Sequence, residues 1–408
     1  MNACFHEACR LLRQATPPRL RACLGNAAMR FGVPSAQPVE RPGEMRLTIL
    51  GAFRSPSGIG EGARLAAEAF ATLGFTVGLL DATSLLQLPS HGPLLAEHPR
   101  FAVGDIGGPL IVHLNPPHFE LALYRLGLSG RSRPLIAVWA WELTKLPRGW
   151  RRAFRIPHEI WVPSRFVASA LHASGCTTPV RVVPHPVLSS SQPAPRERQS
   201  RRPGLRVLNC FAYDSSFDRK NPLAAIAAFR RAFGARQDVE LIVKTQGPRS
   251  EPFEQALLTA VSGADNVRVI DGTIPRAEQQ WLVRSADVTI SLHRAEGFGL
   301  SLAEAMASGQ PVIATAWSGN LDFMTDESAC LVPADLVVTQ ARDPVYSGIQ
   351  SVWAEPRIDA AVVWLERLTD PVLRRRIGEA AHARAVAALG LSRFKGAIAG
   401  SCRIPAAG

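Results

Sequence analysis

The sequence predicts an α/β protein with two doubly wound units, and three observations carry that prediction. Short apolar runs of strand length alternate with longer segments of helical spacing, which is typical of a parallel sheet with crossover helices. The alternation is interrupted by a polar stretch at 188–204 that is rich in Ser, Pro and Arg, the composition of a linker between domains. A chain of 408 residues also accommodates two domains of ordinary size.

The first predicted unit covers 45–187 and begins with an apolar strand at 46–51. A loop at 52–62 follows, and then a helix at 63–73 that Gly74 ends. The remaining strands of this unit are predicted from short apolar runs at 76–81, 110–114, 135–140, 159–162 and 180–183. This order of elements is that of an open parallel sheet.

The second predicted unit covers 205–408 and repeats the rhythm of the first without repeating its sequence. Its first two strands are expected at 205–211 and 239–244, with a helix at 222–233 between them. Three later strands are expected at 267–270, 288–292 and 311–314. A short helix is expected at 300–308 and a strongly helical tail at 359–389. Together the two units predict two doubly wound parallel sheets.

The composition excludes several classes of protein. The net charge is +12, but only four of the 46 basic residues are lysines, so the balance mostly reflects an arginine-rich coding background. The apolar fraction of 47% is too high for a disordered chain, and the apolar runs are too short to span a membrane. Seven scattered cysteines without a CxxC pair argue against a zinc site or a disulfide framework. A cytoplasmic setting fits these features and the absence of a secretory signal pattern.

Residues 1–44 are predicted to be a basic N-terminal extension. Six arginines lie in it with leucines between them, and Pro17 and Pro18 limit it to two short helical pieces. Two interpretations remain open: a basic anchor on the anionic surface of a membrane, or a solvated tail. The first would place the protein peripherally on the inner face of the cell membrane.

The most informative segment covers 287–315 and reads as strand, glycine-containing turn, helix, glycine stop and strand. Ligands of open parallel sheets bind beyond the carboxyl ends of the strands, where this turn is expected. The glycines of the turn allow close approach of a ligand, and the amides of Phe298, Gly299 and Leu300 open a helix whose N-terminus favours phosphate. On spacing alone, an ordinary turn between a strand and a helix remains the alternative.

Two carboxylates flank this turn. Glu296 precedes it and Glu304 lies on the new helix, eight positions later. Carboxylates placed in this way could hold the hydroxyls of a sugar or a ribose while the backbone amides hold phosphate. The segment therefore predicts a nucleotide site at the carboxyl edge of the second sheet.

The run EGFGLSLAE at 296–304 resembles the Glu-x7-Glu signature of the group-1 (family 4) retaining glycosyltransferases, which have the two-domain GT-B fold. The likeness continues through AMASGQPVIAT and through SGN at 318–320, and it covers most of 205–333, with weaker similarity over 45–187. The resemblance implies two Rossmann-like domains that face a cleft. The first would be the acceptor side, and the second would bind the nucleotide-sugar donor.

The resemblance also implies roles for individual residues. Glu304 would bind the ribose hydroxyls of the donor, and Glu296 would contact the hydroxyls of the transferred sugar. The amides at 298–300 would face the diphosphate.

Basic residues are expected beside the same diphosphate. Lys220 matches the family lysine that neutralises the donor, and the arginine of the usual earlier Gly-Arg pair is absent, so its role would pass to the adjacent Arg219. Paired cations at this loop would stabilise charge on the leaving diphosphate, although a solvated pair at a helix start is the alternative. Lys244, at the end of the 239–244 strand, resembles a family variant with a lysine at this point, and it is a third candidate for the phosphates.

Candidates in the first unit follow two of its strands. Gly58 and Gly60 lie in a glycine-rich loop without the Walker pattern, and the resemblance implies that this loop reaches the donor diphosphate; a tight turn is the alternative. The resemblance also implies a histidine near the transferred sugar, for which His113 fits better than Asn115. A structural histidine at a strand end remains the alternative. Glu142, beside two tryptophans, could bind a sugar ring, although burial of the tryptophans in the core explains them as well.

These residues imply a hexosyltransferase that moves a hexose from a nucleotide-diphosphate sugar to a hydroxyl acceptor with retention, in polysaccharide or glycolipid assembly. The expected partners are the nucleotide sugar and a carbohydrate or lipid-linked carbohydrate acceptor, and no nucleic acid is expected. No Asp-x-Asp pair occurs, so we expect metal-independent catalysis and no cofactor besides the donor. Two other functions remain open: a nucleotide-sugar epimerase or phosphorylase of the same fold, and a non-catalytic basic protein that binds membranes or nucleic acid.

Overall fold

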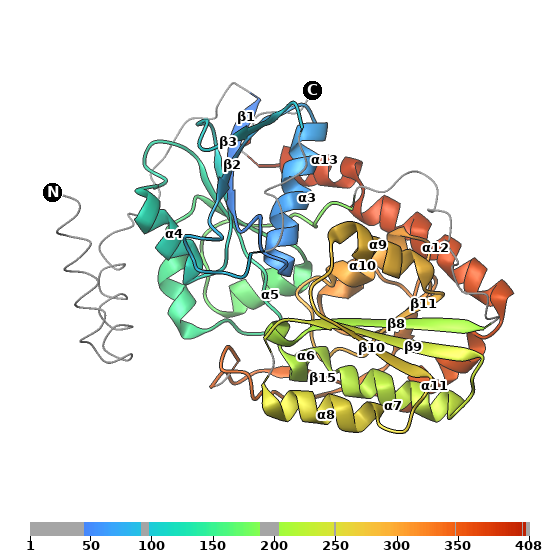
Figure 1. Cartoon of the computed structure of the whole chain (residues 1–408). Helices are drawn as coiled ribbons and strands as arrows, with labels where there is room; N and C mark the ends of the chain where they lie inside the picture. The colour runs from blue at the N-terminus through green and yellow to red at the C-terminus, as the bar shows by residue number, and fades with distance from the viewer. Residues whose placement is uncertain are drawn as a thin grey trace.

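The computed structural model describes residues 45–90, 98–187, 204–248, 250–346, 348–401 and 403–404. The predicted N-terminal extension and all but the last residue of the predicted linker lie outside the described residues, so the expectation of a membrane anchor stays untested. Within the described part, two parallel sheets with helices on their faces form two units that lie side by side (Figure 1). The predicted α/β class with two Rossmann-like units is confirmed.

The first sheet has seven parallel strands in the order β3-β2-β1-β4-β5-β6-β7. Its strands are β1 (Arg46–Gly51), β2 (Thr76–Asp81), β3 (Phe101–Val103), β4 (Leu110–His113), β5 (Leu135–Val138), β6 (Glu159–Val162) and β7 (Val180–Val182). Its helices are α3 (Gly58–Thr72), α4 (His118–Leu126), η1 (Arg148–Arg155) and α5 (Arg165–Ala173). The central strands are mostly apolar and, apart from Arg46 at the start of β1, buried, because helices cover both faces of the sheet.

The second sheet has six parallel strands in the order β10-β9-β8-β11-β12-β13. Its strands are β8 (Leu205–Ala212), β9 (Val239–Gln246), β10 (Val267–Asp271), β11 (Val288–Ser291), β12 (Val312–Thr315) and β13 (Cys330–Val332). The helical segments that follow or connect them are η2 (Tyr213–Ser215), α6 (Phe217–Lys220), α7 (Pro222–Phe233), α8 (Glu251–Val261), α9 (Arg276–Ser285), α10 (Leu300–Ala307), η3 (Gly319–Asp322), α11 (Ile358–Arg367), α12 (Pro371–Leu389) and α13 (Leu391–Ala399). All of the predicted strands of this unit are present.

The strand boundaries differ from the prediction by at most two residues, and two predicted helices differ more, for local reasons. The first helix begins at Gly58 rather than at 63, because Ser57 caps it by accepting a hydrogen bond from the amide of Gly60. The predicted helical tail at 359–389 is two helices, because Asp370 caps a new helix that opens with Pro371.

A two-stranded antiparallel sheet, absent from the sequence prediction, lies between β13 and α11. Its strands are β14 (Ala334–Val338) and β15 (Val352–Pro356). We call residues 334–356 the strap; residue 347 within it lies outside the described part of the chain. The strap contacts both units, as described below.

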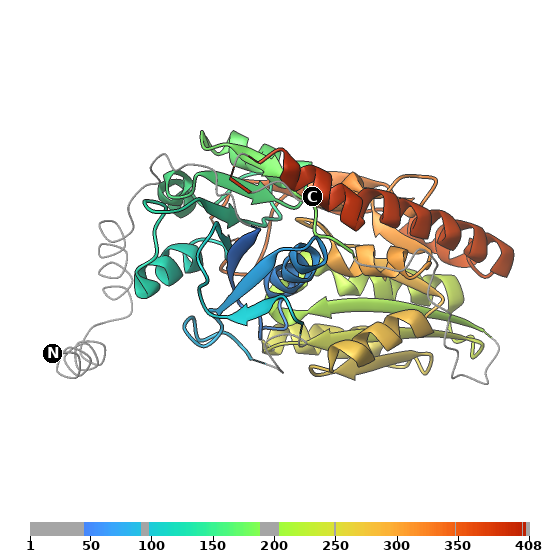
Figure 2. The ribbon, with the colours of Figure 1, turned by 90° about the horizontal axis from the view of Figure 1, so that it is seen from above.

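The C-terminal helices return to the first unit. Figures 1 and 2 show α12 crossing along the second unit and α13 lying beside the first sheet. Phe394 and Ile398 of α13 pack in the same core as Phe70 of α3. The predicted second unit covers 205–408 and so includes α13, which packs on the first unit. The domain boundaries stay predictions.

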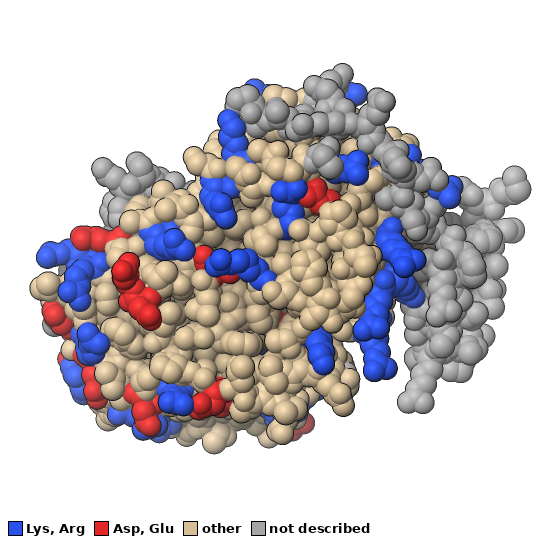
Figure 3. Space-filling model, turned by 180° about the vertical axis from the view of Figure 1, so that it is seen from behind, with Lys and Arg blue, Asp and Glu red and all other residues tan. Residues whose placement is uncertain are grey.

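The charged side chains are unevenly spread. On the face seen in Figure 3, acidic and basic side chains alternate over the second unit, and basic side chains predominate over the first. Segment η1 contributes exposed Arg148, Arg151 and Arg155 to the first unit, while its Trp150 and Phe154 are buried. Within the described ranges, every helix is too short or too polar to cross a bilayer.

Candidate functional site

The N-termini of one helix from each unit face each other at the interface between the units. A Cβ atom placed on Gly58, the first residue of α3, would lie 3.9 Å from Cδ1 of Leu300, the first residue of α10. Figure 1 shows the end of α3 directed toward α10. Since each helix N-terminus carries a partial positive charge, their juxtaposition favours an anion between them.

The turn before α10 needs its glycines for two reasons. Gly299 has φ of 94°, in the left-handed region that residues with a Cβ atom rarely adopt. A Cβ atom on Gly297 would lie 2.9 Å from the carbonyl oxygen of Trp141 in the first unit, so this glycine allows the two units to approach closely. The amides of Phe298, Gly299 and Leu300 have no hydrogen-bond partner in the described chain.

The N-terminus of α3 has a similar arrangement. A Cβ atom on Gly60 would lie 2.5 Å from the carbonyl oxygen of Ala52, so only glycine fits where the loop folds back on itself. The amides of Gly58 and Ile59 have no partner among the described residues. The predicted glycine loop and the predicted phosphate turn therefore come together.

A cluster of ion pairs lies beside the turn. Lys220, the last residue of α6, donates from Nζ to Oε1 of Glu296 at 2.5 Å. Nη1 of Arg219 lies 3.1 Å from Oε2 of the same carboxylate. The structure thus brings Glu296 into contact with Lys220, which lies 76 positions earlier in the chain, and with the adjacent Arg219.

The cations determine the ionisation of Glu296. Burial alone would raise the pKa of its carboxyl group, but Lys220 and Arg219 outweigh burial and lower that pKa to about 2. The backbone of Glu296 is also fixed, because its amide donates to Oγ of Ser318 and its carbonyl accepts from the amide of Gly319. Glu296 is therefore a rigid, ionised carboxylate.

Arg219 is buried deeper than Lys220. Its side chain is 2% exposed, and its guanidinium donates to the carbonyls of Ala295 and Ser215 and to the hydroxyl of Ser215. The side chain of Lys220 is 16% exposed. Lys220 is thus the more accessible of the two cations, and Arg219 is the more deeply buried partner of Glu296.

Glu304 lies at the interface in different surroundings. Burial raises the pKa of its carboxyl group to about 7, and the carboxylate of Glu61 on α3 adds to that effect, while Arg276 and Arg64 oppose it. Arg276 on α9 reaches across the interface to Glu61 at 3.0 Å and to Glu68 at 3.2 Å. The ionisation of Glu304 is therefore influenced by a carboxylate of the other unit.

Lys244 makes different contacts from those of Lys220. Its Nζ donates to the carbonyl oxygens of Thr245 at 2.9 Å and Gly272 at 2.5 Å, and the residue is 3% exposed. These bonds join the end of β9 to the turn after β10. The charges of Lys244 and Lys220 both act against burial to lower the pKa of the Cys210 thiol on β8, which places Lys244 near the site. Lys244 makes no described contact with Glu296.

His113 lies at the end of β4, as predicted, but its described neighbours are not the ion-pair cluster. It lines a small cavity with His185, Ala66 of α3 and Phe394 of α13. Burial lowers the pKa of His113 to about 3, and the charge of His185 contributes in the same direction. His113 is therefore a neutral imidazole at neutral pH. Asn115 is used in the fold, since its amide pairs with the backbone of Ala140.

Three residues of the interface were not predicted from the sequence. The ring of His185 packs edge-on against Phe298, with ring centroids 5.1 Å apart, and so contacts the turn before α10. Arg276 and Tyr346 also connect the two units. The sequence offered one hint for Tyr346, because tyrosine occurs only three times in the chain. It offered no hint for Arg276, because the partners of Arg276 lie on the other unit.

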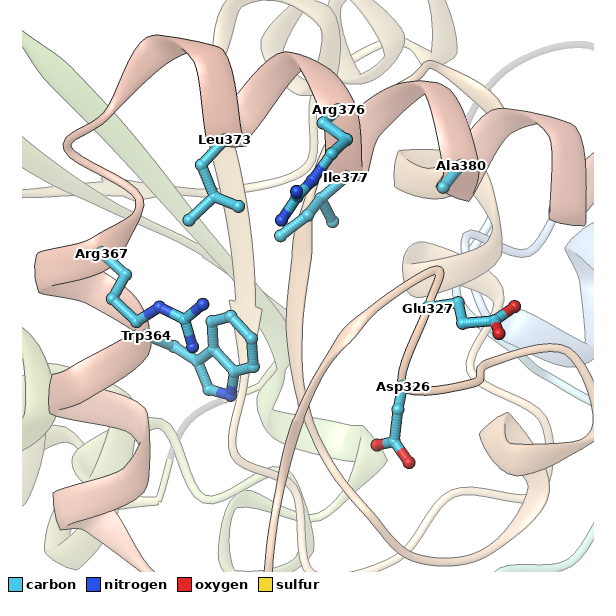
Figure 4. Close-up of a pocket in the computed structure, with 8 residues that line it drawn as sticks. All are labelled: Asp326, Glu327, Trp364, Arg367, Leu373, Arg376, Ile377 and Ala380. Carbon is cyan, nitrogen blue, oxygen red and sulfur yellow. The ribbon is translucent and has the colours of Figure 1, made fainter.

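A separate cavity of about 380 Å³ lies on the outer side of the second unit, between α11, α12 and the loop before β13 (Figure 4). Arg367 stacks on the ring of Trp364 at 4.4 Å, and the carboxylates of Asp326 and Glu327 lie on the opposite rim. None of the predicted site residues lines this cavity. Among the described residues, no group of three or more His, Cys, Asp or Glu side chains is arranged to hold a metal ion, and the expected metal independence stays a prediction.

Comparisons with known proteins agree with this geometry. Phosphatidyl-myo-inositol mannosyltransferase of Mycolicibacterium smegmatis is 27% identical over 233 residues, which cover 55% of this chain and 58% of that protein. The chain thus matches little more than half the length of this curated relative.

Two solved structures have the same fold. Sucrose-phosphate synthase from Thermosynechococcus elongatus has a TM-score of 0.60 at 16% identity, covering 86% of this chain and 96% of that one. Anabaena Alr3699/HepE, in complex with UDP and glucose, has a TM-score of 0.60 at 14% identity, covering 87% of this chain and 98% of that one. The expected GT-B-like arrangement is confirmed.

The sequence also matches the model of a protein family. The model for family 4 glycosyltransferases in conflict systems matches residues 164–387, which is more than half of the chain. The match contains the ion-pair cluster and the turn before α10. The chain belongs to this family of glycosyltransferases.

Proposed function

We propose that the protein is a glycosyltransferase that transfers a hexose from a nucleotide-diphosphate sugar to a hydroxyl acceptor with retention of configuration. The observation that carries the proposal is the ion-pair cluster of Lys220, Arg219 and Glu296 beside two facing helix N-termini. The family match and the mannosyltransferase relative support transfer of a sugar. The UDP and glucose in the HepE structure support a nucleotide sugar as the donor.

The diphosphate of the donor would lie between α3 and α10. The unpartnered amides of Phe298, Gly299 and Leu300 would donate to phosphate oxygens from one side, and those of Gly58 and Ile59 from the other. Lys220 would add a full positive charge where negative charge develops as the glycosidic bond to phosphate breaks. Arg219 would add to this field from its buried position.

Glu296 would bind the transferred sugar rather than attack it. Both of its carboxylate oxygens contact cations, so neither is a free nucleophile, yet each retains lone pairs for sugar hydroxyls. Without a side-chain nucleophile, the acceptor oxygen would approach from the side of the leaving group. The leaving phosphate would then take the proton of the acceptor hydroxyl.

Glu304 would hold the ribose hydroxyls, and Gly60 would allow the loop before α3 to approach the donor. Lys244 would act on the diphosphate only through the loops that it joins. His113 would contact the transferred sugar as a neutral imidazole, with no proton to donate as an acid at neutral pH. The acceptor would be a carbohydrate or lipid-linked carbohydrate, and the mannosyltransferase relative supports a place in glycolipid or polysaccharide assembly.

Isothermal titration tests the donor site. The purified chain should bind UDP-glucose, GDP-mannose or one of the matching nucleoside diphosphates, and Lys220→Ala should weaken that binding roughly tenfold or more, because it removes a charge-assisted contact to phosphate. Lys145→Ala is the matched control, since Lys145 is an exposed lysine on the first unit. Absence of binding to every donor and diphosphate would overturn the proposal. Epimerised sugar formed without any acceptor would favour an epimerase instead.

A further inference from the structure

The N-terminus of α5, in the first unit, contacts the second unit through two consecutive residues. Oγ of Ser164, the residue that precedes the helix, donates to the carbonyl oxygen of Gly297 at 2.6 Å. The backbone amide of Arg165 donates to Oδ2 of Asp322 on η3 at 2.8 Å. The first of these bonds places a side chain of the first unit on the turn before α10.

Ser164 is fully buried, and its hydroxyl makes two hydrogen bonds. While it donates to Gly297, it accepts from the amide of Val167 at 3.3 Å and so caps α5. A serine hydroxyl carries a single proton, and here that proton lies toward Gly297. Ser164 therefore presents a fixed donor to the second unit.

The bond to Gly297 also acts on the amide of Phe298, because the carbonyl and that amide belong to one peptide unit. A trans peptide is planar, so its carbonyl and its N–H point in opposite directions. Gly297 has no side chain and restricts the rotation of this peptide only weakly. A Cβ atom on Gly319 would collide with the same carbonyl oxygen, so the glycine at 319 leaves room for the observed orientation. With its carbonyl held by Ser164, the peptide keeps the amide of Phe298 in one direction.

We propose that Ser164 is a positioning residue of the donor site: by donating to the carbonyl of Gly297, it holds the amide of Phe298 in the orientation that donates to a phosphate oxygen. The inference rests on the proposed function, in which this amide binds the diphosphate. Among the described residues the amide has no hydrogen-bond partner that competes with phosphate. Because Ser164 belongs to the first unit and Phe298 to the second, the turn has its binding form only when the two units are together.

Two substitutions separate the bond to Gly297 from the cap on α5. Ser164→Ala removes both, whereas Ser164→Gly removes the hydroxyl at a smaller cost to the helix, because glycine is accepted at the capping position. Both variants should weaken binding of UDP or GDP, whichever the wild-type protein binds, by about tenfold, because a hydrogen bond to a charged group is lost. If only the cap mattered, Ser164→Gly would bind the nucleotide nearly as well as wild type, and the inference would fail.

Ser351→Ala is the matched control. Oγ of Ser351, on the strap, accepts from the amide of Thr144 at 3.2 Å and lies 2.8 Å from its Oγ1, so it is another buried hydroxyl that joins the two units. Its described hydrogen bonds do not involve the turn before α10. Nucleotide binding by Ser351→Ala should therefore stay close to that of wild type. An equal loss in this control would show that weakening any contact between the units has the same effect, and it would overturn the role of Ser164.

Nuclear magnetic resonance can report on the peptide itself. Protein labelled with ¹³C at the glycine carbonyls and with ¹⁵N in phenylalanine gives correlated signals only from Gly-Phe peptides, which occur twice in the chain, at 74–75 and 297–298. Loss of one signal in Phe298→Leu assigns the pair. Saturating UDP or GDP should shift the amide proton of Phe298 in the wild-type protein, and most of this shift should be missing in both Ser164 variants. The 74–75 signal is the internal control and should stay unchanged.

The same signals decide the inference without nucleotide. In the free Ser164 variants the 297–298 signal should broaden or divide, because the peptide takes more than one orientation once its carbonyl has lost its donor. A single sharp signal there, or a full nucleotide-induced shift in Ser164→Gly, overturns the inference. If the wild-type protein binds no donor and no nucleoside diphosphate, the proposed function fails, while the comparison of the free proteins still decides whether Ser164 orients the peptide.

Discussion

Glu296 and Glu304 flank one turn and one helical start, eight residues apart, yet they lie in opposite electrostatic surroundings. Glu296 is buried and Glu304 is partly buried, and loss of contact with water raises the pKa of a carboxyl group. At Glu296, Lys220 and Arg219 outweigh burial, and the pKa falls to about 2. At Glu304 no cation does so, and the pKa rises to about 7.

The difference follows from where the neighbours originate. Glu296 faces α6 of its own unit, which delivers two cations to one carboxylate. Glu304 is influenced by α3 of the other unit, where the carboxylate of Glu61 repels its negative charge. One glutamate is therefore fixed as an anion by its own unit, and the ionisation of the other depends on how the two units meet.

The largest effect is expected from Glu296→Gln, which removes the negative charge that pairs with Lys220 and Arg219. Lys220 and Arg219 would keep their charges without a counter-ion, and leaving buried charge uncompensated costs about 3 kcal/mol of unfolding free energy. Sugar transfer should fall by about a hundredfold or more, because a charge-assisted contact in the transition state is lost. Chemical denaturation and steady-state kinetics measure the two losses.

Glu355→Gln is the control for this variant. Glu355 also pairs with an arginine, Arg294, but its side chain is 44% exposed and lies on the strap. Its loss should change stability by about 1 kcal/mol at most. Comparable losses in the two variants would show that the buried cluster has no special importance.

The second prediction concerns pH and uses Glu304→Gln. The folded-state pKa of Glu304, about 7, lies above its ordinary value of 4.5, so its proton is held more tightly in the folded state. Wild-type protein therefore loses stability as pH rises from 4.5 through 7, whereas the glutamine variant lacks this loss. The unfolding temperature of Glu304→Gln should equal that of wild type at acidic pH and exceed it above pH 7.

Glu296→Gln should show the opposite sign. Because the folded-state pKa of Glu296 is lowered to about 2, its stabilising effect is present above pH 4.5 and is lost as pH falls toward 2. The two difference curves against pH should thus diverge in opposite directions. Curves of the same sign would contradict the assignment of opposite surroundings to the two glutamates.

The sequence predicted the edge of the sheet at which the site lies, but it could not predict the direction of each side chain. Lys220 and Lys244 were both expected at the diphosphate, since both lie near the carboxyl ends of strands. In the structure Lys220 donates to the carboxylate of Glu296, whereas Lys244 donates to the carbonyl oxygens of Thr245 and Gly272. Lys220 ends the short helix α6 and Lys244 lies on β9, so the contact that each lysine makes depends on the turns and elements around it, which have no local sequence signal.

Contacts between the units could not be predicted from the sequence for a different reason. The glycine-rich turn and the two glutamates form a local pattern, so they could be recognised. Tyr346 and its partner Glu142 are 204 positions apart, and Arg276 and Glu68 are 208 positions apart. Pairing across such distances requires the fold itself, and the strap that brings Tyr346 to Glu142 was not predicted.

The smallest effect is expected from Arg276→Ala, which sharpens the comparison at Glu304. Arg276 is the largest of the two cationic influences that lower the pKa of Glu304, so its removal should raise that pKa further. Wild-type protein and Glu304→Gln begin to differ in stability at a certain pH, the divergence point. When both proteins also carry Arg276→Ala, that pH should be higher. The shift should be a fraction of a pH unit, because the side chain of Arg276 is 41% exposed and its field is screened by water.

Arg268→Ala is the control, since Arg268 is a comparably exposed arginine whose partner, Glu240, lies in its own unit. It should leave the divergence point unchanged. Added salt should reduce the shift caused by Arg276→Ala, because screening weakens an exposed charge more than a buried one. If Arg276→Ala moved the divergence point downward, Arg276 would not be opposing Glu61 at Glu304, and the ionisation of this glutamate would depend on burial in its own unit rather than on the meeting of the two units.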